Sequence, residues 1–373
     1  EHRRVSIGVR DGSAVSKLRG WSWRLVALVG ILGAMLLARA AWLRSRGTDG
    51  GAQQRAFYYW KTKWSASPLL TRTLSENRAS RLYLRFFDVD WDTPTRAAVP
   101  VSPLQLGAPL PAGVEIVPVV FLTNRVFHSI SGPAIDALAE QVFAKLGRMA
   151  EAGGIKLSEL QLDCDWSDGT RARYFYFVEQ VKRRAHAHKL KISSTIRLHQ
   201  IKYAARTGVP PVDRGMLMFY NFGPITAQAA RSSIFNVQDA ERYASYIAAY
   251  ALPLDLALPL FSWTVHSRDG NVLGLIEKLD AADIESAGGF AALSPGRYRA
   301  ARAFFFRGRY FMEDDELLLE ETNPDVTRQA AMTAARGAAR KNSYATIAFF
   351  DLDERNLRHY AASDFQRILA AFR

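Results

Sequence analysis

Short apolar runs alternate with amphipathic stretches along most of the chain. Segments such as 134–154 carry apolar residues at helical spacing, with two glycines that mark the end of a helix. Strands joined by crossovers of helix length pair in parallel, and eight such units close into a barrel. The pattern therefore predicts an α/β fold, a (β/α)8 TIM barrel over residues 55–373. Its eight predicted strands are 56–64, 81–91, 115–124, 159–166, 191–200, 215–223, 254–263 and 344–353.

Two details refine this architecture. An open doubly wound sheet is the alternative, but it normally carries a glycine-rich phosphate loop after its first strand, and residues 60–68 (WKTKWSASP) contain no glycine. The stretch between the seventh and eighth predicted strands is too long for one crossover. We expect an insertion at about 287–322, a hairpin or subdomain around Arg307-Gly308-Arg309, and a final helix at 327–342.

A separate apolar segment lies near the N-terminus. Residues 25–38 carry no charge, which is typical of a signal-peptide core, and continuation to residue 43 past Arg39 gives a length that can span a membrane. The preceding basic residues would hold the N-terminus in the cytoplasm. We therefore predict a basic leader (1–24), a transmembrane anchor or signal segment (25–43) and a flexible linker (44–54). The barrel would lie in the periplasm or outside the cell, anchored in the inner membrane or released by cleavage.

The charge and the cysteine count exclude several classes of protein. The net charge is +13, but nine basic residues against three acidic ones fall within residues 1–50, around the apolar segment. With no nucleic-acid motif in the chain, this charge predicts contact with a membrane through residues 25–43 and no nucleic-acid partner. The single cysteine, Cys164, excludes an internal disulfide and predicts a buried packing residue.

The run LQLDCDW (160–166) predicts where a functional site would lie. Helices cover the outside of a barrel, so Leu160, Leu162 and Cys164 should face outward and Asp163 and Asp165 inward. Both acids come late in the strand, at the mouth where barrel enzymes keep their sites. We therefore predict that Asp163 and Asp165 are the catalytic residues.

Other predicted strands bring polar and aromatic residues to the same mouth. In KISSTIRLHQ (191–200), the alternation turns Arg197 and His199 toward it, and a cation there would relieve repulsion between the two acids. Carboxylates, amides and aromatic rings together suit a polyhydroxylated ligand, and glycoside hydrolysis needs two carboxyl groups. We predict no metal and no cofactor, since no acidic calcium loop is present. The predicted carbohydrate-binding residues are Asp88, Asp90, Trp166, Arg197, His199, Tyr220, Asn221, Trp263 and His266, and Asp351 and Asp353 are further carboxyl groups available by strand position.

These motifs carry a resemblance. LQLDCDW followed by a helix, then STIRLHQ and MLMFYNFG, resembles a group of uncharacterised exported bacterial barrel proteins and, more distantly, the family 18 glycoside hydrolases, the chitinase-like barrels. In those chitinases the fourth strand ends in Asp-x-x-Asp-x-Asp-x-Glu, whose Glu is the general acid, and the sixth carries Met-x-Tyr-Asp. Asp163 and Asp165 match the Asp-x-Asp portion, and Asn221 replaces the last Asp of the sixth-strand motif. Leu160 and Ser167 stand where the first Asp and the Glu are expected.

Two functions remain open at this stage. The first is a glycoside-hydrolase-like enzyme that acts on an envelope or extracellular polysaccharide, with Asp165 as acid, Asp163 as its electrostatic partner, and Arg197, His199, Tyr220 and Asn221 as positioning groups. The second is a non-catalytic glycan-binding or envelope-assembly protein on the same barrel, which Ser167 favours because serine cannot protonate a glycosidic oxygen. A phosphate-handling barrel is less well supported, since no glycine-rich loop follows the last two strands.

Overall fold

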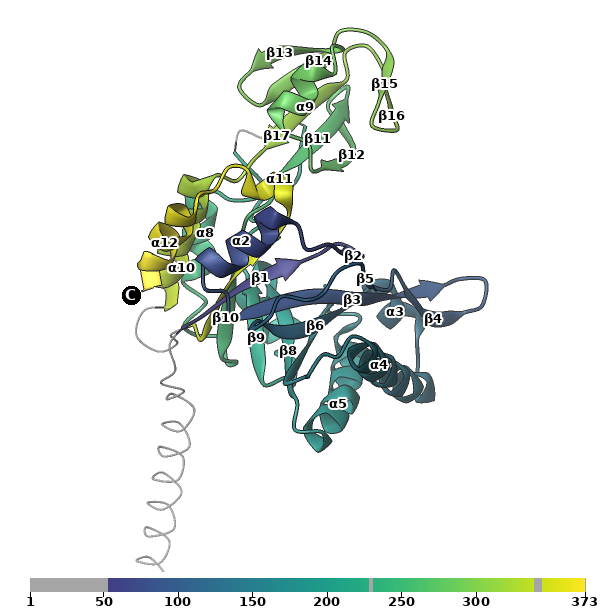
Figure 1. Ribbon diagram of the computed structural model, residues 1–373. Coiled ribbons are helices and arrows are strands. Elements are labelled where there is room, and N and C mark those ends of the chain that lie inside the picture. The colour runs from purple at the N-terminus through teal and green to yellow at the C-terminus, as the bar shows by residue number, and fades with distance from the viewer. Residues whose placement is uncertain (1–52, 228–230, 339–343, 373) are drawn as a thin grey trace, which may run out of the picture. The chain divides into compact units, whose positions relative to one another are not determined.

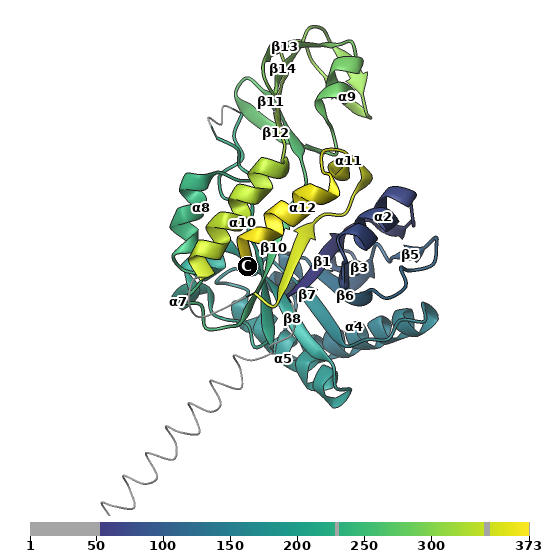
Figure 2. The same cartoon turned by 60° about the vertical axis from the view of Figure 1, so that its left-hand side comes forward.

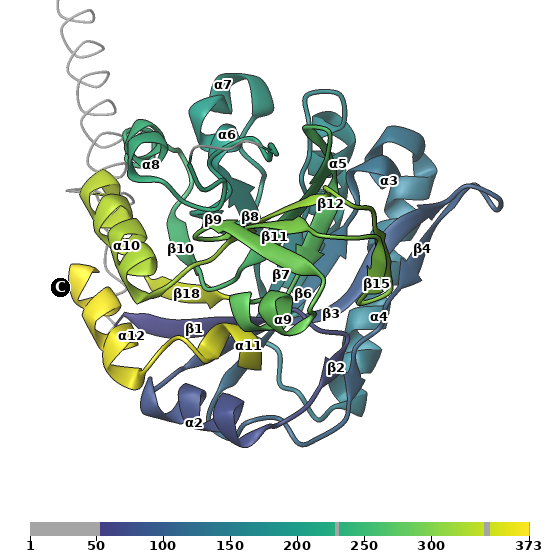
Figure 3. The ribbon, with the colours of Figure 1, turned by 90° about the horizontal axis from the view of Figure 1, so that it is seen from above.

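Eight parallel strands close into a barrel, which confirms the predicted fold (Figure 3). The computed structural model describes residues 53–227, 231–338 and 344–372. Strand β1 pairs in parallel with both β18 and β3, and this double pairing closes the sheet. The barrel strands are β1 (Gln54–Tyr59), β3 (Arg81–Asp92), β6 (Glu115–Leu122), β7 (Glu159–Asp163), β8 (Lys191–Arg197), β9 (Arg214–Met218), β10 (Leu254–Pro259) and β18 (Thr346–Phe350).

The alternation along each strand creates two cores. Leu160, Leu162 and Cys164 are fully buried in the outer core, between the sheet and the helices, as predicted. Tyr58 and Met218 belong to the inner core, within the barrel. Because successive side chains of a strand point to opposite faces, the residues between the outward leucines of β7 must line the interior.

Helices surround the barrel on its outside (Figures 2 and 3). Their caps follow ordinary chemistry: Ser67 accepts a hydrogen bond from the Leu70 amide, and Pro68 occupies the first helical turn. The barrel helices are α2 (Pro68–Glu76), α3 (Asn124–Ser129), α4 (Pro133–Ala152), α5 (Arg171–Ala187), α6 (Leu198–Lys202), α7 (Ala204–Thr207), α8 (Val237–Ala244), α10 (Pro324–Ala338), α11 (Glu354–Leu357) and α12 (Ala362–Leu369), and η1 (Ala370–Phe372) is a short 3₁₀ helix.

Strand β3 is longer than its neighbours and contains a bulge. Its register against β6 shifts between Arg85 and Phe87, and beyond the bulge it pairs with antiparallel β4 (Ala97–Val101). A bulge reverses which residues face inward. Arg85 before it and Asp88 after it therefore come to lie on the same side of the strand and form an ion pair. A small parallel pair, β2 (Lys63–Trp64) and β5 (Gln105–Leu106), lies beside this region.

A second sheet is inserted between β10 and β18 and rises from the barrel (Figure 1). It begins at Trp263, earlier than the expected start of the insertion at about 287: β10 ends at Pro259, and the last residue of the predicted strand 254–263 is the first residue of β11. In this sheet β11 pairs with β12, the next strand along the chain, and with β17, which is distant in sequence. The sheet contains β12 (Asn271–Glu277), β11 (Trp263–Arg268), β17 (Glu316–Glu320), β14 (Arg297–Ala300) and β13 (Phe290–Ser294), with α9 (Ala281–Ser286) and the hairpin β15 (Phe304–Phe306) and β16 (Arg309–Phe311) beside it.

The predicted leader, the segment 25–43 and the linker up to residue 52 lie outside the described residues. Among the helices that the structure describes, none has the length and apolar character needed to cross a bilayer.

Candidate active site

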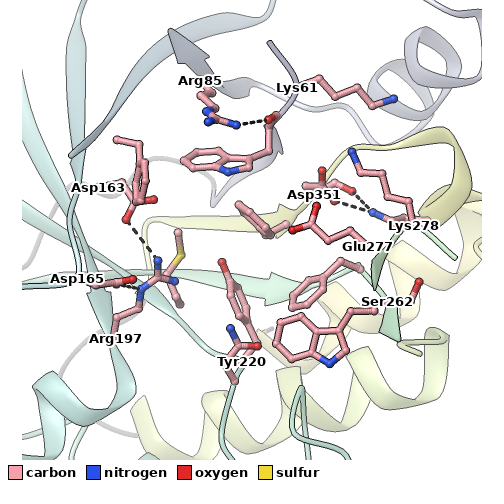
Figure 4. Close-up of a pocket in the computed structure, with 18 of the residues that line it drawn as sticks. Lys61, Arg85, Asp163, Asp165, Arg197, Tyr220, Ser262, Glu277, Lys278 and Asp351 are labelled. Atoms are coloured by element: carbon pink, nitrogen blue, oxygen red, sulfur yellow. Dashed lines mark hydrogen bonds and ion pairs between the residues drawn. The ribbon is translucent and has the colours of Figure 1, made fainter. Parts of the chain in front are cut away.

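A cavity of about 690 Å³ opens at the carboxyl ends of the barrel strands (Figure 4). Residues that follow β1, β7, β9 and β18 line it, and the inserted sheet contributes Trp263, Glu277 and Lys278. The lining includes four carboxyl groups and six aromatic rings. Its residues are Trp60, Lys61, Thr62, Arg85, Phe121, Asp163, Asp165, Arg197, Met218, Tyr220, Asn221, Phe261, Ser262, Trp263, Glu277, Lys278, Phe350, Asp351 and Asn356.

Asp163 is the last residue of β7 and points into this cavity, as the alternation predicts. Thr195 Oγ1 donates to its Oδ1 at 2.6 Å, and Arg197 Nη2 lies 3.5 Å from the same oxygen. Within the described residues, no hydrogen bond reaches Oδ2. Burial raises the pKa of Asp163 above its usual range, against the opposing effect of the Arg197 guanidinium.

Asp165 shares the same guanidinium. Arg197 Nε donates to Asp165 Oδ1, while its Nη2 faces Asp163, so one planar cation holds both acids (Figure 4). The two side chains differ in exposure, at 54% for Asp165 and 3% for Asp163. Because both carboxylates contact one guanidinium, the two acids lie close together at the cavity wall.

A third carboxyl group, Asp351, stands just after β18. It is 5% exposed, and Asn356 Nδ2 donates to its Oδ1 at 2.6 Å. Burial raises its pKa to about 6, although the Lys278 ammonium opposes this shift. Two residues further along, Asp353 forms ion pairs through Oδ2 with Lys61 Nζ at 2.8 Å and with Lys278 Nζ at 3.3 Å. Burial opposes ionisation of Asp353, but the hydrogen bond from Lys61 keeps its pKa below the usual range.

Aromatic rings form much of the cavity wall. Phe350 lies at the centre of a cluster in which its ring centroid is 5.4 Å from Trp60 and 5.5 Å from Tyr220. Phe261 packs against Tyr220 and Trp263 at 5.3 and 5.4 Å, and Trp263 Nε1 donates to Glu320. These contacts fix the rings in place, so the cavity offers rigid apolar faces beside its carboxyl groups.

Six residues predicted for the site line this cavity: Asp163, Asp165, Arg197, Tyr220, Asn221 and Trp263. Asp88 does not line it: its carboxylate is paired with Arg85, and of these two residues Arg85 lines the cavity. Asp90 is also outside, where Arg125 and Thr123 hydrogen-bond to its carboxylate.

The remaining three predicted residues, Trp166, His199 and His266, are placed elsewhere. Trp166 is buried among the outer helices, with Nε1 donating to the Thr207 carbonyl. The alternation that turns Asp163 inward turns Trp166 outward. His199 falls in α6, because β8 ends at Arg197, and burial lowers the pKa of its imidazole. His266 is buried in the inserted sheet, 3.0 Å from Asp315.

Several lining residues were not selected from the sequence. Lys61 and Trp60 follow β1 directly, a position that strand reasoning could have found. Glu277 and Lys278 are brought in by the inserted sheet, and no local signal marks them. Ser167 does not line the cavity; its backbone amide donates a hydrogen bond to Thr170 Oγ1 at the start of α5. Among the described residues, no group of three or more His, Cys, Asp or Glu side chains is placed to hold a metal ion.

Comparisons with known proteins identify the fold. No protein-family model and no curated protein sequence matches the chain. Among solved structures, a class V chitinase from Pseudomonas fluorescens aligns with a TM-score of 0.51 and 13% identity, over 86% of this chain and 100% of that one. The spore cortex-lytic enzyme SleL of Bacillus megaterium aligns with a TM-score of 0.50 and 12% identity, over 86% and 74%. The distant resemblance to family 18 glycoside hydrolases is thus confirmed for the fold: the chain is similar to these enzymes in its barrel architecture.

Proposed function

We propose that this protein is a glycoside-hydrolase-like enzyme that acts on a polysaccharide at the mouth of its barrel. The observation that carries the proposal is the pair Asp163 and Asp165, held by one guanidinium beside a cavity with rigid aromatic walls. Most glycoside hydrolases use two carboxyl groups near the scissile bond, and several carboxyl groups line this cavity.

The size and lining of the cavity support a sugar ligand. A volume of about 690 Å³ is within the range of small-molecule sites, roughly 300–1,000 Å³. Aromatic faces such as those of Trp60 and Trp263 stack on sugar rings, while Asn221 and the carboxylates can bond hydroxyl groups. The likeness to a chitinase and a spore cortex-lytic enzyme favours a polysaccharide over a small metabolite.

The location of the substrate follows from the N-terminal prediction. If residues 25–43 anchor the chain in the inner membrane, or direct its export as a cleaved signal, the barrel meets polysaccharides of the periplasm or cell surface. An envelope or extracellular polysaccharide is therefore the substrate class that we propose.

A substrate panel tests this function. The purified full chain is incubated with peptidoglycan, chitin, chitosan, cellulose and xylan, and released reducing ends are measured. We expect hydrolysis of at least one polymer, with a loss of about 10²–10⁴-fold in Asp163→Asn. Asp90→Asn is the matched control, because Asp90 is a strand-end carboxylate outside the cavity. Absence of hydrolysis across the panel would contradict the proposal.

A non-catalytic glycan-binding protein is the second candidate. Ser167 favours it, since the resemblance to chitinases implies a Glu at that position and Ser167 does not line the cavity. Binding of a polymer without release of reducing ends, and with equal affinity in Asp163→Asn, would support this alternative. Calorimetry with soluble oligosaccharides measures the binding.

A further inference from the structure

Carboxyl groups stand on two opposite walls of the cavity. In the closed barrel, β7 and β18 are four strands apart in either direction, so their ends face each other across the mouth. Asp163 ends β7, and Asp351 directly follows β18. Figure 4 shows Asp163 with Asp165 and Arg197 on one side of the space and Asp351 with Glu277 and Lys278 on the other.

We propose that Asp351 is the proton donor of this site and that Asp163, on the opposite wall, is the carboxylate that activates water. This inference rests on the proposed glycoside-hydrolase function and assigns a catalytic residue that the chitinase-like motifs do not contain. The two groups come from strands on opposite sides of the barrel, and the cavity that both line lies between them. That arrangement is the one expected for inversion at the anomeric carbon.

The hydrogen bonds of Asp351 are suited to a neutral carboxyl group. Its Oδ1 accepts from the Asn356 amide at 2.6 Å, and the same amide reaches the Asp351 carbonyl oxygen at 3.2 Å. Because Oδ1 is occupied by a donor, a proton on the group belongs on Oδ2. No described residue bonds to Oδ2, and the side chain lines the cavity. A proton on Oδ2 can therefore be donated to a ligand.

The charged surroundings of Asp351 support this role. Burial raises its pKa to about 6, so the group stays largely protonated in mildly acidic solution. Asp353 and Glu277 add to that effect, while Lys278 and Lys61 oppose it. Both lysines form ion pairs with Asp353, which satisfies their charge without a bond to Asp351.

Asp165 has the opposite surroundings. It is more than half exposed and its Oδ1 accepts from the guanidinium of Arg197. A carboxylate that serves as the ion-pair partner of an arginine is poorly suited to deliver a proton. The acid role expected for Asp165 from the sequence therefore passes to Asp351, and Asp165 with Arg197 positions Asp163.

The reaction step balances with water as the only co-reactant. Asp351 Oδ2 gives its proton to the glycosidic oxygen as the bond from that oxygen to the anomeric carbon breaks, and the leaving oxygen keeps the electron pair. A water oxygen bonds to the anomeric carbon from the opposite face, and Asp163 takes the proton that this water loses. Return of one proton from Asp163 to Asp351 through solvent restores the site.

Leaving-group dependence tests the assignment. Asp351→Asn is compared with wild type, full chain in both, on the polymer that wild type hydrolyses and on dinitrophenyl β-glycosides of N-acetylglucosamine and glucose. We expect polymer hydrolysis to fall about 10²–10⁴-fold, with turnover of the dinitrophenyl glycosides kept within a few-fold, because that leaving group needs no proton. Asp90→Asn, a carboxylate outside the cavity, should match wild type on both.

The outcomes separate the inference from the function on which it rests. Polymer hydrolysis that Asp351→Asn leaves unchanged would overturn the proton-donor role and leave the hydrolase standing. No hydrolysis by wild type on any substrate would overturn both. A carboxyl titration by NMR with ¹³C-labelled aspartate needs no substrate: one signal should titrate near pH 6 and disappear in Asp351→Asn, and titration near pH 4 instead would overturn the assignment.

Discussion

Buried carboxylates have different partners at the two ends of the barrel. At the closed end, which is the end where the barrel strands begin, Glu159 Oε1 accepts a hydrogen bond from Ser193 and Oε2 pairs with Arg81 at 2.8 Å. Asp255 likewise uses both oxygens, with Arg214 on each and the Thr346 amide on Oδ1. At the mouth, the side-chain hydrogen bonds that Asp163 and Asp351 accept from other described residues reach Oδ1 and not Oδ2.

This difference separates structural from functional acids within one fold. A buried carboxylate whose oxygens are both paired holds neighbouring strands in place and has no oxygen left to bind a ligand. One with an oxygen directed into a cavity is free to bind or exchange a proton with a substrate. Site residues in a barrel are thus better identified by incomplete pairing at the mouth than by burial alone.

The largest expected effect is at the closed end. Arg81→Ala would leave Glu159 buried without its cation, and we expect the free energy of unfolding to fall by about 3–5 kcal/mol. Urea denaturation followed by circular dichroism measures it. Arg328→Ala, which removes an exposed ion pair with Asp325, is the control and should show no measurable change. Equal stability of Arg81→Ala and wild type would show that the closed-end network is dispensable.

The next effect has the opposite sign and depends on pH. The folded-state pKa of Asp351, about 6, is above the ordinary aspartate value of 3.8, so the folded chain binds this proton more tightly than the unfolded chain does. The group therefore favours folding below pH 3.8 and loses that contribution as the pH rises through 6. Asp351→Asn should be more stable than wild type by about 3 kcal/mol at pH 8 and nearly equal to it at pH 4.

Denaturation series at both pH values check the Asp351→Asn prediction. Asp353→Asn is a useful comparison, because the folded-state pKa of Asp353 is lowered. Its carboxylate stabilises the fold above its unfolded pKa, so this variant should be less stable than wild type at pH 8. If the two variants showed the same dependence of unfolding free energy on pH, the opposite pKa shifts of Asp351 and Asp353 would be contradicted.

A smaller change in stability is expected for Asp163→Asn. The substitution keeps the shape of the side chain, and Arg197 retains Asp165 as a partner, so the free energy of unfolding should change by about 1 kcal/mol or less. Hydrolysis should nevertheless be lost. Parallel measurement of unfolding and activity tests this, and a destabilisation as large as that of Arg81→Ala would remove the contrast between the two ends.

The smallest effect is expected for Ser167→Ala. Ser167 contacts Thr170 near the start of α5 and does not line the cavity. Loss of its hydroxyl should change stability by less than about 1 kcal/mol and leave hydrolysis and glycan binding unchanged. The same assays measure both properties. A marked drop in activity would contradict the placement of Ser167 outside the active site.

The barrel was predictable because strand alternation is a local property. All eight predicted strands correspond to barrel strands, and the alternation of β7 correctly turned Asp163 inward and Cys164 outward. Extended by one residue pair, the same rule would have turned Trp166 outward. The β3 bulge was not readable in this way, because it shifts the register in the middle of an otherwise regular pattern.

Partners distant in sequence were not predictable. His266 has the composition of a site residue, yet Asp315, in the turn before β17, holds it within the inserted sheet. Asp90 is taken by Arg125 in the same way. Glu277 and Lys278 reach the cavity because β12 pairs with β11, and β11 in turn pairs with the sequence-distant β17.

The sequence by itself determined the number and order of the barrel strands and the inward direction of Asp163, since both depend on a period of two residues. The tertiary structure decided which acids have a cation, which have an amide, and which oxygen faces the cavity. The environment of a carboxyl group depends on burial and on neighbours brought together by chain closure. Asp351 and Asp163 stand opposite each other only because β1 joins β18 to β3 and closes the barrel.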